Sequence, residues 1–378
     1  MGISVFIAGD IVPYGRTREL FTRKQTTELF GEILQDIQRS DFRIANLEAP
    51  VKYGAATPID KPGPNLMTTE ETAAVIKKAG FDLVTLANNH FFDQGQQGVK
   101  DTIDACDKAG LKTVGGGCTL ETARRVLYHT IAGKTIAIIN ACEHESSVAT
   151  TEHGGSNPLD LIDIGNDIIE ARHKADYVLV IIHGGIEHYH LPTPRMKKWY
   201  RHFVTLGADA VINHHQHCIS GYELYKGRPI FYGLGNFNFD RISEYVGQDS
   251  WSKGYAVELE LSENIGFRLI PYIQNGEKTG IKLRNYTDFE KETDALNIII
   301  EDDRRLEEEL YSYVHNNRKE LFLPYLPINN RFLKAMYRRG LLKLKISRKK
   351  AMRLSNKITC ESHLDVYKTL FDYILKEK

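Results

Sequence analysis

The sequence predicts an α/β fold in which two β-sheets pack against each other and helices cover their outer faces. The first 110 residues alternate short apolar runs with amphipathic segments, which is the rhythm of successive βα units. Residues 221–273 instead contain consecutive β-rich runs separated by short turns. Two packed sheets with helices outside satisfy both halves of this pattern.

The expected elements alternate in chain order as far as residue 212. Thr68 and Glu71 are spaced as a capping box for a helix that Gly80 ends, and Gly110 ends the next helix. Strands are expected at residues 3–8, 42–46, 83–86, 177–182 and 210–212, and helices at residues 26–38, 69–79, 98–109, 158–173 and 193–206.

Turns and β-rich runs dominate the later part of the chain. Ala132-Gly133 predicts a tight hairpin between strands at residues 126–131 and 135–140. The remaining strands are expected at residues 221–224, 229–233, 255–261 and 267–273.

Composition and charge narrow the class of protein. The chain has 378 residues, 42% of them hydrophobic, which suffices for one main domain, residues 1–275, and a smaller helical extension, residues 276–378. Its formal net charge is zero, so no overall field points to a nucleic acid, and no specific nucleic acid partner is predicted. The five cysteines are odd in number and widely spaced, which argues against a disulfide framework and favours a reducing compartment.

The two ends of the sequence bear on its location. The N-terminal apolar run is too short for a signal peptide, and no segment approaches the ~20 apolar residues of a membrane-spanning helix. We therefore expect a cytoplasmic protein, at most peripheral at the inner membrane. Residues 331–357 contain eleven Lys and Arg and no Asp or Glu. This basic run is either a solvated helical face or a patch for an anionic polymer or the inner leaflet.

Six polar clusters follow predicted strands or β-rich runs. A single cluster of this kind is usually a turn or a hydrogen-bonded structural residue, but six at successive strand ends predict a shared site. Converging carboxylates and imidazoles are costly to bury unless a divalent cation binds them. The clusters are Gly9-Asp10, Asn46-Leu47-Glu48, Asn88-Asn89-His90, HGGIEH at residues 183–188, HHQH at residues 214–217, and Gly235-Asn236-Phe237.

The sequence His215-Gln216-His217 adds detail to this expected metal site. In an extended loop, side chains two residues apart point to the same side, so both imidazoles reach neighbouring ions. A two-metal site stabilises the attacking and leaving oxygens of a phosphoryl displacement, and a further His can protonate the leaving group. The pattern predicts one or two divalent ions, drawn from Mn, Zn, Fe and Mg.

Longer stretches around these clusters carry a family resemblance. They are AGD at residues 8–10, IANLEAP at 44–50, LANNH at 86–90, DQG at 93–95, HGGIE at 183–187, GADAVINHHQH at 207–217 and YGLGNF at 232–237. In content and order they resemble the capsule-biosynthesis CapA/PgsA family of poly-γ-glutamate synthesis, a branch of the calcineurin-like metallophosphoesterases. The resemblance covers roughly residues 1–275.

The resemblance implies a four-layer α/β/β/α sandwich and a role for each matching residue. His90 would be the general acid or would orient the phosphate, and Asp93 would orient His90. The implied metal ligands are Asp10 and His217 for the first ion, Glu48 as a bridge in place of the usual Asp, and Asn89, His183 and His215 for the second ion.

One position departs from the wider group, and three further residues are candidate substrate contacts. Val12 stands where a His ligand usually follows the first Asp, which leaves three protein ligands for the first ion. Arg16 either meets an anionic substrate or is an exposed loop residue. Glu187 either contacts substrate or orients His183. Asn236 either contacts substrate or shapes the loop beside the site.

These observations support a metal-dependent hydrolase that cleaves a phosphoester bond in an anionic small molecule or polymer. The departure at Val12 keeps open the alternative of a non-catalytic or weakly catalytic component of a surface-polymer assembly system. A weaker alternative is an amide hydrolase acting on a γ-glutamyl polymer. The sequence contains no GxxxxGK[ST] loop, no GxSxG elbow and no GxGxxG after a strand, which argues against nucleotide-driven ligation, serine hydrolysis and dinucleotide binding.

The basic run generates a prediction about membranes. If residues 331–357 bind an anionic leaflet, removing residues 331–378 should weaken binding to phosphatidylserine vesicles by about 1 kcal/mol for each Lys or Arg that had lain at the surface. Vesicle co-sedimentation measures this binding, with neutral phosphatidylcholine vesicles as the control. Equal binding by the full chain and the shortened chain would leave only the solvated-face interpretation.

Overall fold

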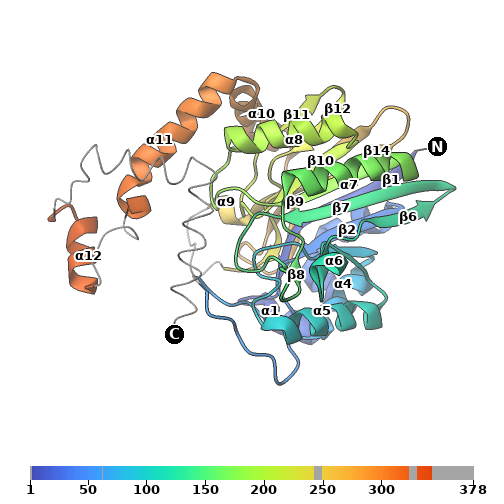
Figure 1. The fold of residues 1–378 in the computed structure, drawn as a ribbon, viewed down its shortest axis with the longest axis horizontal. Helices are drawn as coiled ribbons and strands as arrows, with labels where there is room; N and C mark the ends of the chain where they lie inside the picture. The colour runs from blue at the N-terminus through green and yellow to red at the C-terminus, as the bar shows by residue number, and fades with distance from the viewer. Residues whose placement is uncertain (1, 62, 242–248, 323–329, 343–378) are drawn as a thin grey trace. The chain divides into compact units, whose positions relative to one another are not determined.

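The computed structural model describes residues 2–61, 63–241, 249–322 and 330–342. The chain divides into two compact units, residues 1–308 and residues 309–378, and each is described by itself. The first unit contains two large sheets and most of the helices (Figure 1). Among the described residues, no helix has both the length and the apolar character needed to cross a bilayer.

The first sheet has eight strands and is built around β1. β1 pairs in parallel with β2 and β13 and antiparallel with β14. The order is β16-β15-β14-β1-β2-β3-β4, with β13 paired to β1 beyond this path. The strands are β1 Ile3–Val12, β2 Phe42–Leu47, β3 Leu83–Thr85, β4 Lys112–Val114, β13 Asn236–Phe239, β14 Lys253–Leu261, β15 Gly266–Gln274 and β16 Ile281–Leu283.

The second sheet has six strands in the order β11-β12-β10-β9-β7-β6. The predicted hairpin is confirmed, because Ala132 and Gly133 both have positive φ between β6 and β7. The strands are β6 Leu127–Ile131, β7 Lys134–Cys142, β9 Tyr177–His183, β10 Ala210–His214, β11 Tyr222–Tyr225 and β12 Arg228–Phe231. A separate two-stranded sheet joins β5 Gly116–Gly117 to β8 Gly155–Ser156.

Helices cover the outer faces of both sheets, so the predicted four-layer α/β/β/α sandwich is confirmed. Figure 1 shows α7 and α8 on one side of the sandwich and α4 and α5 on the other. The helices of the first unit are α1 Thr17–Thr22, α2 Thr26–Phe30, α3 Leu34–Arg39, α4 Glu71–Ala79, α5 Gly95–Ala109, α6 Leu120–Ala123, α7 Leu161–Lys174, α8 Pro194–Leu206, α9 Asp249–Ser252 and α10 Tyr286–Glu301.

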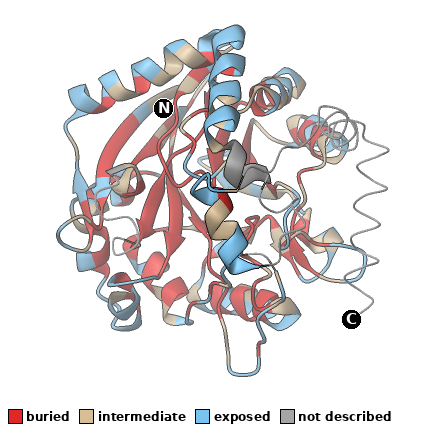
Figure 2. Cartoon of the chain, turned by 90° about the vertical axis from the view of Figure 1, so that its left-hand side faces the viewer, coloured by how far each residue is buried: buried red, intermediate tan, exposed pale blue. Residues whose placement is uncertain are grey.

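The alternation along β1 places its side chains in two different cores. Val5 and Ile7 join the core between the sheets with residues such as Ile181 of β9. Phe6 and Ala8 face the helices on the other side. Figure 2 shows the consequence, since the strands are buried while the outward faces of the helices are exposed.

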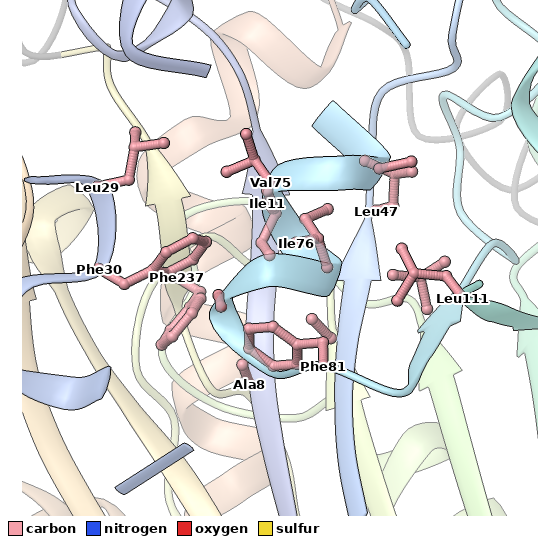
Figure 3. Close-up of a cluster of buried hydrophobic side chains, with 14 of the residues drawn as sticks. Ala8, Ile11, Leu29, Phe30, Leu47, Val75, Ile76, Phe81, Leu111 and Phe237 are labelled. Atoms are coloured by element: carbon pink, nitrogen blue, oxygen red, sulfur yellow. The ribbon is translucent and has the colours of Figure 1, made fainter. Parts of the chain in front are cut away.

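The core beneath the helices is rich in aromatic residues. Phe237 of β13 lies 5.8 Å from Phe30 and 6.0 Å from Phe81 between ring centroids, and 5.4 Å from Tyr272. Figure 3 shows Phe30, Phe81 and Phe237 packed beneath α4. This packing fixes β13, which starts at Asn236, beside β1.

Several helix boundaries differ from the sequence prediction, and for two of them the structure shows the reason. The helix expected at residues 26–38 is interrupted at Gly31, whose φ is +51° and where a Cβ would lie 2.4 Å from the carbonyl oxygen of Ile281. The approach of β16 therefore replaces one long helix with α2, a 3₁₀ turn at Gly31–Ile33 and α3. The helix expected from residue 158 begins at Leu161, because the side chain of Asp160 caps it.

The predicted capping box of α4 is wrong, although its predicted end is right. α4 begins at Glu71, and the hydroxyl of Thr68 contacts the hydroxyl of Thr72 at 2.6 Å instead of a backbone amide. Gly80 ends α4 and Gly110 ends α5 in the left-handed conformation, as expected.

The C-terminal part is helical where it is described. α10 belongs to the first unit, where Phe289 is fully buried and lies 5.2 Å from Tyr255. α11, Asp303–Phe322, runs from the first unit into the second, and α12 is Arg331–Arg338. Residues 343–357 of the predicted basic run lie outside the described residues.

The aromatic core yields a prediction about stability. Phe237→Ala should lower the free energy of unfolding by about 3–5 kcal/mol, because the ring is fully buried among other rings. Leu224→Ala is the control, since Leu224 is 60% exposed and should change stability by less than about 0.5 kcal/mol. Urea unfolding of both variants measures the difference, and similar losses in the two would contradict this account of the core.

Candidate metal centre

The carboxyl ends of parallel strands bring the predicted site residues together. In the register of the first sheet, Asp10 lies opposite Asn46 of β2 and Asn236 of β13. In the second sheet, His214 lies opposite His183. The register of β1 shifts beside Asp10 toward both parallel neighbours, and a β-bulge of this kind redirects a side chain.

Within the described part of the chain, three overlapping sets of side chains could each hold a metal ion. Within each set, the three ligand atoms lie within 4.8 Å of one another. The sets share residues, so together they form one cluster in which all members except Glu187 are buried. The sets are Glu48, His183 and His215; Asp10, Glu48 and His217; and Glu187, His215 and His217.

Asn89 joins the set around His183. Its Oδ1 lies 2.9 Å from Nε2 of His183, and Nδ1 of His215 lies 3.1 Å from the same nitrogen. The three residues assigned to the second ion by resemblance thus meet at one point. Amide oxygen and imidazole nitrogen both suit a borderline divalent cation.

Glu48 provides the strongest indication that the cluster fits a cation. The residue is fully buried, and neither carboxylate oxygen has a hydrogen-bond partner among the residues that the structure describes. Its Oε1 lies 3.5 Å from Nε2 of His183 and 3.7 Å from Nε2 of His217. Burial and the nearby Asp10 raise the pKa of Glu48 well above its ordinary value. A divalent cation would supply the partner that these oxygens lack.

Two imidazoles of the cluster, those of His183 and His215, are held in their neutral form, which is the form that binds metals. Burial, followed by the neighbouring His215, lowers the pKa of His183 well below its ordinary value. Burial and His217 lower the pKa of His215 to about 4. Burial alone would raise the pKa of Asp10, but the hydrogen bond to His217 and the surrounding imidazoles lower it instead. Asp10 is therefore a carboxylate at neutral pH.

The loop that carries His215 and His217 is not extended, contrary to the sequence prediction. Both residues have positive φ, +91° and +55°. Backbone of this kind is strained for a residue other than glycine and is concentrated at functional sites. The two imidazoles still converge, with ring centroids 6.0 Å apart, but the left-handed turns bring them together rather than an i, i+2 alternation.

His90 and Asp93 form the expected pair. Nδ1 of His90 lies 2.6 Å from Oδ2 of Asp93, and both side chains are buried. Burial lowers the pKa of His90 by more than the hydrogen bond to Asp93 raises it. With Nδ1 directed at Asp93, Nε2 is the nitrogen left to face a ligand.

Lys61 is a member of this group that the sequence analysis missed. Its side chain is 5% exposed, pairs with Asp93, and places Nζ 3.2 Å from Nδ1 of His90. A lysine in a long loop carries no sequence signal of such a contact. Asn46, which had been noted only as part of a cluster, donates to Oδ1 of Asp10 at 2.7 Å and orients that carboxylate.

The three candidate substrate contacts have different surroundings. The guanidinium of Arg16 forms an ion pair with Asp240 at 2.9 Å and donates to backbone carbonyls of the 275–277 turn. Asn236 accepts at 2.9 Å from Nδ1 of His217 and therefore orients that ring. Glu187 is exposed beside His215 and His217, with which it forms one of the three possible ligand sets.

Val12 faces an apolar cluster rather than the metal ligands. It is 1% exposed and packs with Ala49, Leu66, Phe239 and Trp251. The ring of Trp251 lies 5.1 Å from that of His217. The position that usually supplies a His ligand thus contributes to an apolar wall beside His217.

A two-sheet α/β sandwich with carboxylate, amide and imidazole side chains gathered at its strand ends defines a candidate metal-binding domain. The chain belongs to the family described as bacterial capsule synthesis protein PGA_cap, which it matches over residues 4–241.

Relatives of known name share this region. The chain is 32% identical over 247 residues to the capsule biosynthesis protein CapA of Bacillus anthracis, covering 63% of this chain and 60% of that protein. It is 33% identical over 243 residues to the PGA biosynthesis protein CapA of Bacillus subtilis, covering 63% and 64%. The match therefore spans less than two thirds of either relative. Among solved structures, a novel phosphatase from Mycoplasma pneumoniae is similar at 14% identity, with 72% of this chain and 94% of that chain covered and a TM-score of 0.47.

The unpartnered carboxylate of Glu48 yields a prediction for the metal-free protein. Glu48→Gln removes a buried ionisable group whose charged form the fold disfavours, so the metal-free variant should be more stable than wild type by about 1–3 kcal/mol at neutral pH. Because the fold raises the pKa of Glu48, the cost of its ionisation grows as pH rises above the ordinary carboxyl range. The advantage of the variant should therefore shrink toward acid pH.

Metal should reverse this order. At a Mn²⁺ concentration one hundred times the dissociation constant, wild type should gain about 2.7 kcal/mol, and Glu48→Gln should gain much less. Thermal unfolding with and without chelator measures both effects. A metal-free variant less stable than wild type at neutral pH would show that Glu48 has a stabilising partner within the protein.

Proposed function

We propose that the chain is a metal-dependent phosphoester hydrolase of capsule or poly-γ-glutamate biosynthesis. The observation that carries the proposal is the convergence of Asp10, Glu48, His183, His215 and His217, with both oxygens of Glu48 buried and lacking a partner. A buried set of this composition is costly in the absence of a cation. The names of the Bacillus relatives, capsule and PGA biosynthesis proteins, support the biological setting.

The residues around the centre have distinct tasks in this proposal. Divalent ions would be held by Asp10, Glu48, Asn89, His183, His215 and His217 and would stabilise negative charge on the transferring phosphoryl group. Asn46 and Asn236 orient Asp10 and His217 through hydrogen bonds of 2.7 Å and 2.9 Å. The buried Trp251 and Phe239 exclude water from one side of His217.

His90 is the proposed general acid, which protonates the leaving oxygen. Its Nδ1 is held by Asp93, so Nε2 is the nitrogen that faces the leaving oxygen and donates a proton to it when the ring is in its protonated form. Asp93 is itself held by Lys61 and by the backbone amide of Leu66, at 2.6 Å in the latter case. The imidazole therefore has a fixed ring orientation before substrate arrives.

The proposal predicts the effect of removing this acid. His90→Ala should lower the turnover of an aryl phosphodiester or monoester with Mn²⁺ by about 10²-fold, with a smaller change in KM. His202→Ala is the control, because His202 is exposed on α8 and should keep the wild-type rate. Steady-state release of the aryl alcohol measures both. Full activity in His90→Ala would remove His90 from the mechanism.

One observation favours a second candidate function. Val12 fills a usual ligand position with an apolar side chain, which suits a structural metal centre in a non-catalytic component of a surface-polymer assembly system. Full metal loading without turnover of a broad panel of phosphoesters would favour this alternative. Turnover that disappears with His90→Ala would exclude it.

A further inference from the structure

The solvent side of the centre carries a carboxylate that the implied ligand set leaves out. Glu187 is exposed, yet one of its carboxylate oxygens forms a set with a ring nitrogen of His215 and a ring nitrogen of His217. All three atoms lie within 4.8 Å of one another. The two imidazoles also belong to the buried sets that contain Glu48. Glu187 therefore approaches these imidazoles from an exposed position, whereas Glu48 approaches them from a buried one.

The backbone holds Glu187 in this place. The amide of His188, the next residue, donates to the carbonyl of Gln216 at 2.8 Å, between the two imidazoles of the HHQH loop. The amide of Gly184 donates to the carbonyl of His214 at 3.3 Å. The side-chain amide of Gln216 donates to the carbonyl of Tyr189 at 2.8 Å. The loop with Glu187 and the loop with His215 and His217 thus form one hydrogen-bonded unit.

Charge argues against a direct contact between Glu187 and a phosphoester. A carboxylate repels a phosphate, and Glu145 adds a second carboxylate with Oε1 3.7 Å from Nε2 of His215. A cation between Glu187 and the imidazoles turns this repulsion into attraction. The first-ion set also needs a donor, because Val12 packs into the apolar cluster with Phe239 and Trp251.

We propose that Glu187 is a metal ligand that acts with His215 and His217. It supplies an additional ligand atom where Val12, at the usual His position, supplies none. The inference rests on the metal dependence of the proposed function and adds a residue to its centre. It assigns a binding role to a residue of the β9–α8 loop, whereas the usual ligand would come from the end of β1.

Metal affinity tests the inference directly. Metal-free full-length protein is dialysed against a series of free Mn²⁺ concentrations, and bound manganese is measured by mass spectrometry. Glu187→Gln should lower the affinity of at least one ion by about tenfold or more, as loss of a ligand requires. Glu187→Asp keeps the charge and should lie between Glu187→Gln and wild type.

Glu145→Gln is the matched control, because it removes the same charge from the same rim. Glu145 lies near His215 but belongs to none of the three ligand sets. Loss of its charge should change Mn²⁺ affinity by less than about fivefold. Similar effects of Glu187→Gln and Glu145→Gln would overturn the inference, because they would reduce Glu187 to a source of negative potential.

The result separates this inference from the proposed hydrolase. Weakened Mn²⁺ binding in Glu187→Gln, with no hydrolysis by wild type, would support the ligand role and overturn the hydrolase. Hydrolysis by wild type with unaltered Mn²⁺ binding in Glu187→Gln would do the reverse. A wild-type protein that binds no Mn²⁺ would overturn both. Thermal unfolding of the metal-free variants checks that each is folded.

Discussion

The buried carboxylate of Glu48 is the constraint around which the site is organised. A carboxylate without a hydrogen-bond partner in a buried position is among the most costly arrangements in a folded protein. The surrounding groups do not offset that cost, since Asp10 adds like charge and the imidazole of His183 is kept neutral by burial. The fold therefore places an acidic group without a compensating partner at the point where the strand ends of its two sheets meet.

The position of the site residues is fixed largely by β1. Alternate residues of β1 enter the two cores, so the strand cannot slide by one position without exchanging them. Its partners β2 and β13 place Asn46 and Asn236 beside Asp10. The packing of Phe237 against Phe30 and Phe81 then fixes β13 from the other side. The packed core thus holds Asp10 and the side chains beside it in defined positions.

The sequence was sufficient to predict most strands, the layers and the group of residues that the structure brings together. Strand-end position was the useful signal, because parallel strands bring residues distant in sequence to one edge. Features that depend on tertiary contacts were not predictable. Gly31 breaks a helix because β16 approaches it, and His215 and His217 converge through left-handed backbone that no propensity indicates. Lys61 was missed because a single lysine in a loop has no periodic or positional signature.

The attachment of Lys61 has a consequence for how this domain tolerates change. Ile59 and Leu66, on either side of Lys61, also bind Asp93, through its carbonyl and its carboxylate respectively. Surface loops usually accept insertions readily. This loop instead holds Asp93, and Asp93 in turn orients the imidazole of His90. Shortening or lengthening that loop would therefore disturb the position of His90, the proposed proton donor, even though the loop holds none of the proposed metal ligands.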